Sequence, residues 1–185
     1  MPDDDIIVVE YDPRWPSRFN AERLLILEAL APLALRVEHV GSTSVPGLCA
    51  KPVLDILVGV DEFLPAEVYS SRLQKLGYRW GDSEESGRHF FAKVPRTAHV
   101  HVVRYRSWDW YSKIFLRDVM RGDVEFCREY AALKRDLASK YHQDRSAYSH
   151  GKDALVEERL RTECSARLVR IRGSGEEKDD RAIGP

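Results

Sequence analysis

The chain has 185 residues, which is enough for one well-packed domain and too few for two of ordinary size. Its 29 basic and 30 acidic residues leave a formal net charge of −1, so no overall basic field indicates a nucleic-acid partner. No apolar run approaches the roughly 20 residues that span a membrane. The acidic start of the chain is unlike a secretory signal, and the three scattered cysteines match no zinc-binding spacing. We therefore expect a cytoplasmic protein with reduced thiols.

The first third of the chain alternates short strands with helices. Residues 6–10 are expected to form a strand or an extended arm. A helix is expected to start with Asp12 as N-cap and Pro13 as its first residue, and to end before Pro32. Apolar strands are predicted over 35–40 and 53–58, joined by a turn of small residues, and a further helix over 61–76.

The remainder begins with strands and ends with helices. A brief strand over 78–80, a polar loop over 81–87 and an antiparallel hairpin of strands 88–94 and 98–105 are predicted. Three helices follow, over 108–120, from the cap Asp123 to about residue 141, and from about residue 146 to 168. The charged residues 173–185 are predicted to be a disordered tail, so the single predicted domain covers residues 1–172.

The turn that follows the first apolar strand is a candidate anion site. Gly41 allows the backbone to turn without a Cβ penalty, and three hydroxyl residues, Ser42, Thr43 and Ser44, come next. Backbone N–H groups in such a turn can form a concave nest that binds phosphate. Gly-Ser turns are also common in ordinary loops, so the interpretation depends on the charged residues nearby.

Asp55 is the single charged residue of the apolar strand 53–58. A carboxylate in a buried strand needs a partner, which is either a basic group or a metal ion. Lys51, just before this strand, would add a positive charge near the predicted phosphate site, or would lie solvated at the strand end.

His99 and His101 are two residues apart on a predicted strand, so their side chains share one face about 6–7 Å apart. They suit two metal ligands, or a general base beside a phosphate-binding cation, or a polar face exposed to solvent. If Asp55 shares this face, a site of one carboxylate and two imidazoles would favour zinc, manganese or iron. Arg88 on the partner strand adds positive charge to the same hairpin.

The basic residues of the later helices carry less information. Long basic side chains are mostly solvated, so we expect no ligand contact from Lys113, Arg117, Lys134 or Lys152. The chain contains no P-loop, dinucleotide-binding fingerprint, HExxH motif or nucleophile elbow.

The segment EHVGSTSVPGL at residues 38–48, with Lys51-Pro52 and Asp55-Ile56, resembles the signature of the GrpB-like family. This is a set of small bacterial proteins within the nucleotidyltransferase-fold superfamily. The later His-Val-His strand and the FLRD segment at 115–118 resemble it too, so the resemblance covers about residues 6–165. It implies an α/β (α+β) fold, in which a nucleotidyltransferase-like mixed β-sheet is flanked by helices, with a helical C-terminal part.

The superfamily resemblance also implies a metal-dependent chemistry from which this chain departs. In active members the turn holds triphosphate, and a pair of acids two residues apart, with a third acid on a neighbouring strand, binds two magnesium ions that activate a hydroxyl. Asp55 matches the first acid, but Leu57 stands at the second position. His99 and His101 stand where the third acid would be expected.

Two hypotheses follow from these observations. The first is a transferase that binds a nucleotide or another phosphate-bearing small molecule. Its expected site residues are Gly41, Ser42, Thr43, Ser44 and Arg88 for the ligand, Asp55, His101 and Lys51 for catalysis, and Asp55, His99 and His101 for a divalent magnesium, manganese or zinc ion. The second hypothesis, supported by Leu57, is a non-catalytic module that kept the fold and binds a nucleotide, a phosphate or a partner. Neither requires a membrane or a nucleic acid.

Overall fold

The computed structural model describes residues 5–81 and 87–162. Most of the predicted loop over 81–87, the end of the last predicted helix and the predicted tail over 173–185 lie outside these residues. Within them, five strands form one sheet in the order β1-β2-β5-β4-β3. The strands are β1 (Ala34–Val40), β2 (Leu54–Val60), β3 (Tyr78–Gly81), β4 (Arg88–Lys93) and β5 (Ala98–Arg104).

The sheet is mixed, as the resemblance implied. β2 and β5 pair in parallel at its centre, and the pairs β1–β2, β4–β5 and β3–β4 are antiparallel. The predicted hairpin of residues 88–94 and 98–105 is therefore confirmed. The parallel register sets Asp55 opposite His99 and Leu57 opposite His101. Because side chains alternate along a strand, these four residues lie on one face of the sheet.

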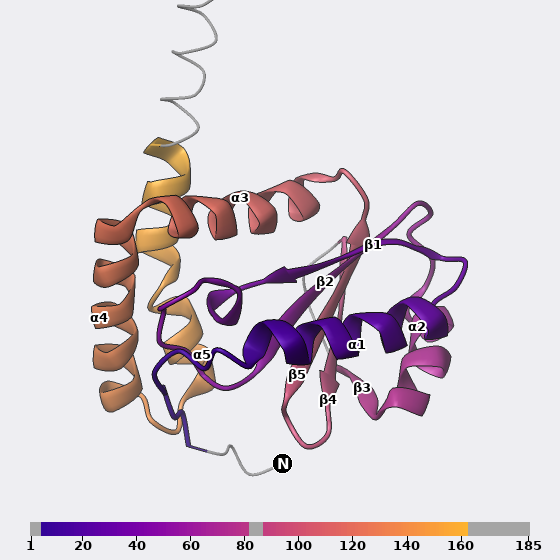
Figure 1. The fold of residues 1–185 in the computed structure, drawn as a ribbon, viewed down its shortest axis with the longest axis horizontal. Coiled ribbons are helices and arrows are strands. Elements are labelled where there is room, and N and C mark those ends of the chain that lie inside the picture. Colours follow the sequence, from indigo (N-terminus) through magenta and orange to yellow (C-terminus); the bar gives the residue numbers. More distant parts are fainter. Residues whose placement is uncertain (1–4, 82–86, 163–185) are drawn as a thin grey trace, which may run out of the picture.

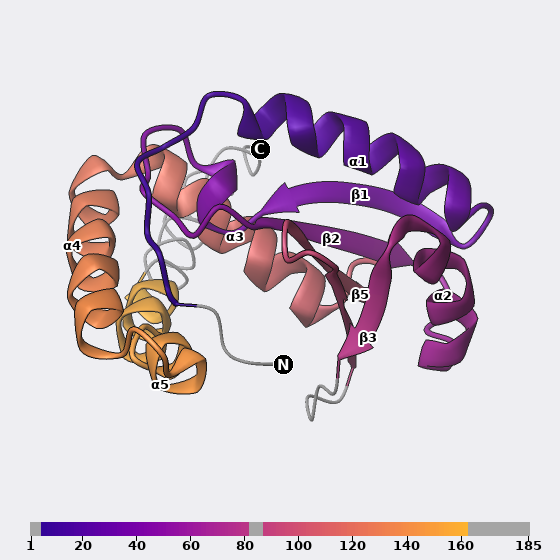
Figure 2. The ribbon, with the colours of Figure 1, turned by 90° about the horizontal axis from the view of Figure 1, so that it is seen from below.

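The opposite face carries the larger hydrophobic core. Apolar residues of the central strands, such as Ile56, Val58 and Val100, pack there with Ile26 of α1 (Trp15–Ala29) and Tyr69 of α2 (Ala66–Leu73). All five residues have no measurable solvent exposure. Figure 2 shows α1 lying along this face over β1 and β2. Two helices thus close one side of the sheet, and the polar strand residues face the other side.

Three later helices lie on the side of the polar face or next to its end. They are α3 (Trp108–Gly122), α4 (Val124–Lys140) and α5 (Arg145–His150), and residues 153–162 are also helical. Trp110 of α3 packs against Leu57 and Val103, which covers part of this face. In Figure 1, α4 and α5 stand beside one end of the sheet rather than over it. The remaining part of the polar face therefore opens toward α5 and the helical residues after it.

An N-terminal arm joins the sheet to these helices. The Ile6 N–H donates to the carbonyl of His142, and Val9 forms a single antiparallel bridge with Ala50. Ile6 is buried in one cluster with Leu137 and Tyr148. The arm predicted over 6–10 is therefore extended and makes one isolated bridge instead of a full strand.

Three predicted helix boundaries are wrong. α1 begins at Trp15 with Arg14 as N-cap, because the Asp12 carboxylate accepts from the N–H and side chain of Arg14 and does not cap the helix. α2 begins only after Pro65, which disfavours a helical conformation in the residue before it. The last predicted helix is interrupted at residues 151–152, where Gly151 lies against Leu137 with no room for a side chain.

No helix in the described part of the chain is both long and apolar enough to cross a membrane.

Candidate functional site

The turn after β1 is shaped by Gly41. Its φ of 68° and ψ of −174° belong to a backbone region that is essentially restricted to glycine. The short 3-10 helix Ser42–Ser44 follows, and the Ser44 hydroxyl donates to the Gly41 carbonyl at 2.6 Å. Thr43 Oγ1 lies 3.0 Å from the buried His39 Nε2. The turn is therefore fixed by its own side chains, with Ser42 and Thr43 on the wall of a cavity.

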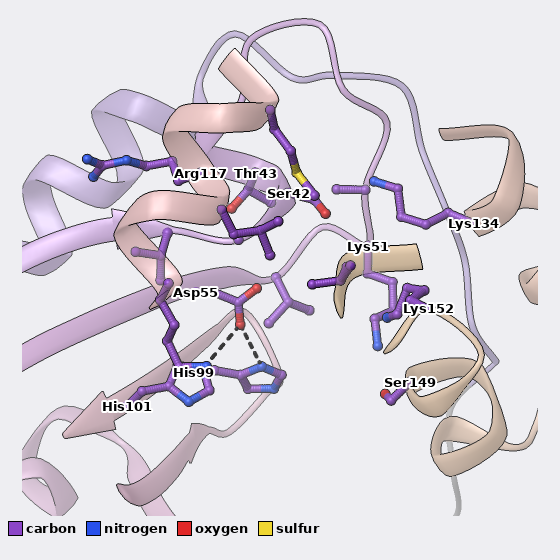
Figure 3. Close-up of a pocket in the computed structure, with 18 of the residues that line it drawn as sticks. Ser42, Thr43, Lys51, Asp55, His99, His101, Arg117, Lys134, Ser149 and Lys152 are labelled. Carbon is purple, nitrogen blue, oxygen red and sulfur yellow. Dashed lines mark hydrogen bonds and ion pairs between the residues drawn. The ribbon is translucent and has the colours of Figure 1, made fainter. Parts of the chain in front are cut away.

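Asp55, His99 and His101 meet on the wall of this cavity, as Figure 3 shows. His99 Nδ1 lies 3.3 Å, and His101 Nε2 3.5 Å, from the same oxygen, Asp55 Oδ1. Asp55 Oδ2 lies on the other side, against Gly41, where an added Cβ would be 2.4 Å away. His99 and His101 share one face of the sheet as predicted, and Asp55 lies on the same face beside the predicted turn.

Arg88 fixes the protonation of His101. Its guanidinium Nη1 lies 3.1 Å from His101 Nδ1, and a guanidinium can only donate hydrogen bonds. His101 Nδ1 is therefore the acceptor, and the neutral ring carries its proton on Nε2, which donates to Asp55. Burial lowers the pKa of His101 to about 4, so the ring is neutral near pH 7.

Asp55 is ionised in this arrangement. Burial by itself would raise the pKa of Asp55, but the hydrogen bonds from His101 and His99 outweigh it and hold that pKa well below its ordinary value. The side chain is still about one-third exposed (34%), and it faces the cavity. The site thus contains a fixed carboxylate held by two imidazole N–H groups.

Basic side chains line the rest of the cavity, which has a volume of about 470 Å³. Lys51, before β2, and Lys152, after α5, place their ammonium groups 4.8 and 4.1 Å from the centre of the Tyr148 ring. Burial lowers the pKa of both lysines, to about 8 for Lys152, and the charge of Lys51 lowers that of Lys152 further. Within the described residues, neither lysine forms an ion pair.

Lys134 is the most deeply buried cation of the wall, with only 2% of its surface exposed. It donates to the Cys49 carbonyl and lies 4.9 Å from the centre of the Tyr130 ring. Burial lowers the pKa of Lys134 to about 8. The six basic side chains that line the cavity outnumber the two acidic ones; the basic residues are Lys51, Arg88, Lys113, Arg117, Lys134 and Lys152.

The structure brings together most of the site residues predicted from the sequence. Eight of the predicted residues line the cavity, namely Gly41, Ser42, Thr43, Lys51, Asp55, Arg88, His99 and His101. Ser44 does not line the cavity, because its hydroxyl donates to the Gly41 carbonyl and the residue is only 4% exposed.

The four basic residues of the later helices also line the cavity, so the expectation that they are only solvated is wrong. Lys134 and Lys152 each stand four residues after a tyrosine, Tyr130 and Tyr148, over whose ring they lie. That repeated spacing is a signal that sequence inspection could have used, because residues four apart on a helix are neighbours.

The expected metal site was Asp55, His99 and His101. In the part of the chain that the structure describes, no three His, Cys, Asp or Glu side chains are arranged so that they could hold a metal ion. The two imidazoles turn their N–H groups toward Asp55, so these three residues fit a hydrogen-bonded set better than a set of metal ligands.

Comparison with known proteins gives a consistent family. The family model described as "GrpB protein" matches residues 5–162. An uncharacterised protein of Pseudomonas aeruginosa, named UPF0157 protein PA4798, is 42% identical, and the matched segment covers 83% of this chain and 66% of that protein. This chain therefore spans about two thirds of the length of that relative.

Solved structures agree with this comparison. The crystal structure of the conserved protein GrpB from Enterococcus faecalis is 33% identical, with a TM-score of 0.76, over 82% of this chain and 93% of that one. A structure of Cid1, a protein with RNA terminal uridylyl transferase activity, is 10% identical, with a TM-score of 0.50 over 71% of this chain and 42% of that one. The second likeness shows the fold alone, which is nucleotidyltransferase-like.

Proposed function

This chain belongs to the GrpB family, and from that membership we propose that its cavity binds a phosphate-bearing small molecule, with nucleotides as the first class to test. The observation that carries the proposal is the pair Lys51 and Lys152 opposite the turn Gly41–Thr43. Two ammonium groups near one ring repel each other; burial lowers the pKa of both lysines, and the charge of Lys51 lowers that of Lys152 further. A bound phosphate would offset both charges.

The predicted nest supports the same proposal from the other side of the cavity. Ser42 offers its hydroxyl, and the start of the 3-10 turn offers backbone N–H groups, where anions are stabilised. In Figure 3, Ser42 and Thr43 lie above Asp55, and Lys51 and Lys152 lie to the right of these residues. A triphosphate would bridge the turn and the two lysines.

The test is calorimetric titration of the protein with ATP, GTP, CTP, UTP and inorganic tripolyphosphate. Replacing Lys51 and Lys152 by methionine should weaken binding by about tenfold per lysine, because a charge-assisted hydrogen bond contributes about 1.5–3 kcal/mol. Lys140→Met is the matched control, since Lys140 also lies over a tyrosine ring, 5.1 Å from the centre of Tyr141, but outside the cavity. The proposal is refuted if the Lys51 and Lys152 replacements bind as tightly as the unmodified protein and the Lys140→Met control. It is also refuted if no probe binds to the unmodified protein.

A second candidate function is transfer of a nucleotidyl or phosphoryl group from such a ligand. The ionised Asp55 favours it, because a carboxylate beside a phosphate site can orient a hydroxyl that attacks the phosphorus while pyrophosphate or the nucleoside diphosphate leaves. In this reaction Lys51 would stabilise the charge that develops on the phosphate, and His101 would hold Asp55 in place. Consumption of the nucleotide with a panel of small hydroxyl and amine acceptors, abolished by Asp55→Asn, is the expected result. Turnover that survives Asp55→Asn would eliminate it.

A further inference from the structure

Leu57 occupies the strand position at which metal-dependent members of the superfamily have their second acidic ligand. It has no measurable exposure and packs with Val40, Val103 and Trp110 beneath α3. No oxygen or nitrogen donor therefore extends from this position toward Asp55. The carboxylate pair that holds two magnesium ions in metal-dependent nucleotidyltransferases is reduced to a single acid.

His101 is unsuited to replace the missing ligand. A histidine that binds a metal through one ring nitrogen normally donates the N–H of the other nitrogen to a carboxylate, carbonyl or water. In this site the other nitrogen, Nδ1, faces the Arg88 guanidinium at 3.1 Å and must accept. The proton therefore stays on Nε2, the atom that faces Asp55, and no lone pair remains there for a metal ion.

His99 leads to the same conclusion. Its Nδ1 lies 3.3 Å from the ionised Asp55, so this nitrogen carries the proton and donates. The one lone pair left on the two imidazoles is at His99 Nε2, which is buried and has no hydrogen-bond partner among the described residues. Asp55 Oδ2, the remaining carboxylate oxygen, lies against Gly41. One buried imidazole lone pair beside a single carboxylate falls short of the three protein ligands of a usual catalytic metal site.

We infer that this cavity binds its phosphate ligand as the metal-free anion, and that Lys51, Lys152 and Arg88 supply the positive charge that magnesium ions supply in metal-dependent relatives of the fold. The inference rests on the proposed function and adds to it the form in which the ligand is recognised. In this arrangement Asp55 is an internal acceptor for two histidines, and its charge opposes binding of the phosphate.

The first experiment compares ATP binding in excess EDTA with binding in excess magnesium or manganese. We expect affinity in EDTA to equal or exceed affinity with the metals, because ATP complexed to magnesium carries less negative charge. Asp55→Asn should bind ATP more tightly, by about threefold or more, because a negative charge leaves the cavity while the shape and the acceptor oxygen remain. Binding that requires a divalent metal, or that Asp55→Asn abolishes, would overturn the inference.

The second experiment needs no nucleotide and no variant. Nuclear magnetic resonance of ¹⁵N-labelled imidazoles in the unmodified protein reports which ring nitrogen carries the proton. We expect His101 to keep its proton on Nε2, and His99 on Nδ1, when zinc or magnesium is added. Loss of either proton to zinc would show that the histidines are ligands after all. If no probe binds in EDTA or in magnesium, the proposed function fails and this inference fails with it, whereas binding that appears only with a divalent metal keeps the proposed function and overturns the inference alone.

Discussion

Gly41 and Asp55 are in contact across the turn, and this contact leaves no space for a side chain at Gly41. A Cβ there would lie 2.4 Å from Asp55 Oδ2 and 2.9 Å from its Cβ. The backbone conformation of Gly41 is also one that other residues adopt only under strain. The glycine is therefore needed for two separate reasons, conformation and proximity.

Gly41→Ala should lower the free energy of unfolding by about 3 kcal/mol, of which about 1–2 kcal/mol is backbone strain and the rest is overlap with Asp55. Gly47→Ala is the control, because Gly47 has a φ of 80° but nothing within 4 Å of the added Cβ. It should lose only the strain contribution. Urea unfolding of both variants measures the difference, and equal losses would show that the contact with Asp55 is unimportant.

The strand residues of the site were predictable from the sequence because alternation and hairpin pairing are local rules. His99 and His101 follow from a period-two pattern, and the hairpin pairing places Arg88 on the same face. The partners of those side chains were not predictable. Whether Asp55 contacts a metal or an imidazole N–H depends on the guanidinium of Arg88, and no local rule gives that contact.

At the scale of elements, side chains cap the N-termini of α3 and α4. The Ser107 hydroxyl accepts from the Trp110 N–H, and Asp123 Oδ1 accepts from the Phe126 N–H at 2.9 Å. Asp123 has a second role, because its other oxygen accepts from Arg159 in the helical segment that follows α5. Asp123 thus joins two of the helices around the cavity.

Asp123→Ala should therefore cost more than Ser107→Ala. Loss of an N-cap costs about 1 kcal/mol, which is what we expect for Ser107→Ala, whereas Asp123→Ala should cost about 2 kcal/mol because the partly buried ion pair is lost too. Asp123→Asn keeps a capping oxygen and loses only the ion pair, so it should cost about 1 kcal/mol less than Asp123→Ala. Thermal unfolding of the three variants tests the order, and an Asp123→Ala loss equal to that of Ser107→Ala would contradict it.

The ends of the five strands were predicted to within two residues, whereas some helix ends were not. Short apolar runs bounded by Gly, Pro and charged residues define β1, β2 and β5 well. The start of α2 depends on Pro65 and on the Tyr69 hydroxyl, which binds the backbone of Glu62 and Leu64 and stabilises the non-helical approach. Such tertiary hydrogen bonds compete with helical propensity and are not visible in a sequence pattern.

At the scale of the whole molecule, the sheet order could not be predicted. The hairpin of β4 and β5 is local, but the parallel pairing of β2 with β5 joins segments more than forty residues apart. That pairing brings Asp55 beside His99, and the packing of α4 and α5 then adds Lys134 and Lys152. The part of the site that depends on long-range packing is the part that the sequence did not reveal.

The folded protein should lose stability as the pH falls from about 6.5 to about 4. Burial lowers the pKa of His39 and of His101 to about 4. An unfolded chain binds protons at its histidines below about pH 6.5, so it holds more protons than the folded chain in this range, and stability decreases with decreasing pH. The loss is at most on the order of 3 kcal/mol per histidine.

Urea unfolding at several pH values measures this slope. Replacing His39 and His101 by glutamine should flatten it, whereas His142→Gln, at an exposed position, should leave it unchanged. An unchanged slope in the double variant would assign the acid sensitivity to other groups.

The N-terminal arm links this cavity to a part of the backbone that no ligand touches. Ile6 is buried with Tyr148, and the Tyr148 ring lies beneath the ammonium groups of Lys51 and Lys152. A ligand that fixes the positions of these two lysines would also stabilise the contact between Tyr148 and Ile6, on which the arm depends. Because such coupling is reciprocal, ligand binding should slow hydrogen exchange at the Ile6 amide, which donates to His142, and release of the arm should weaken the ligand.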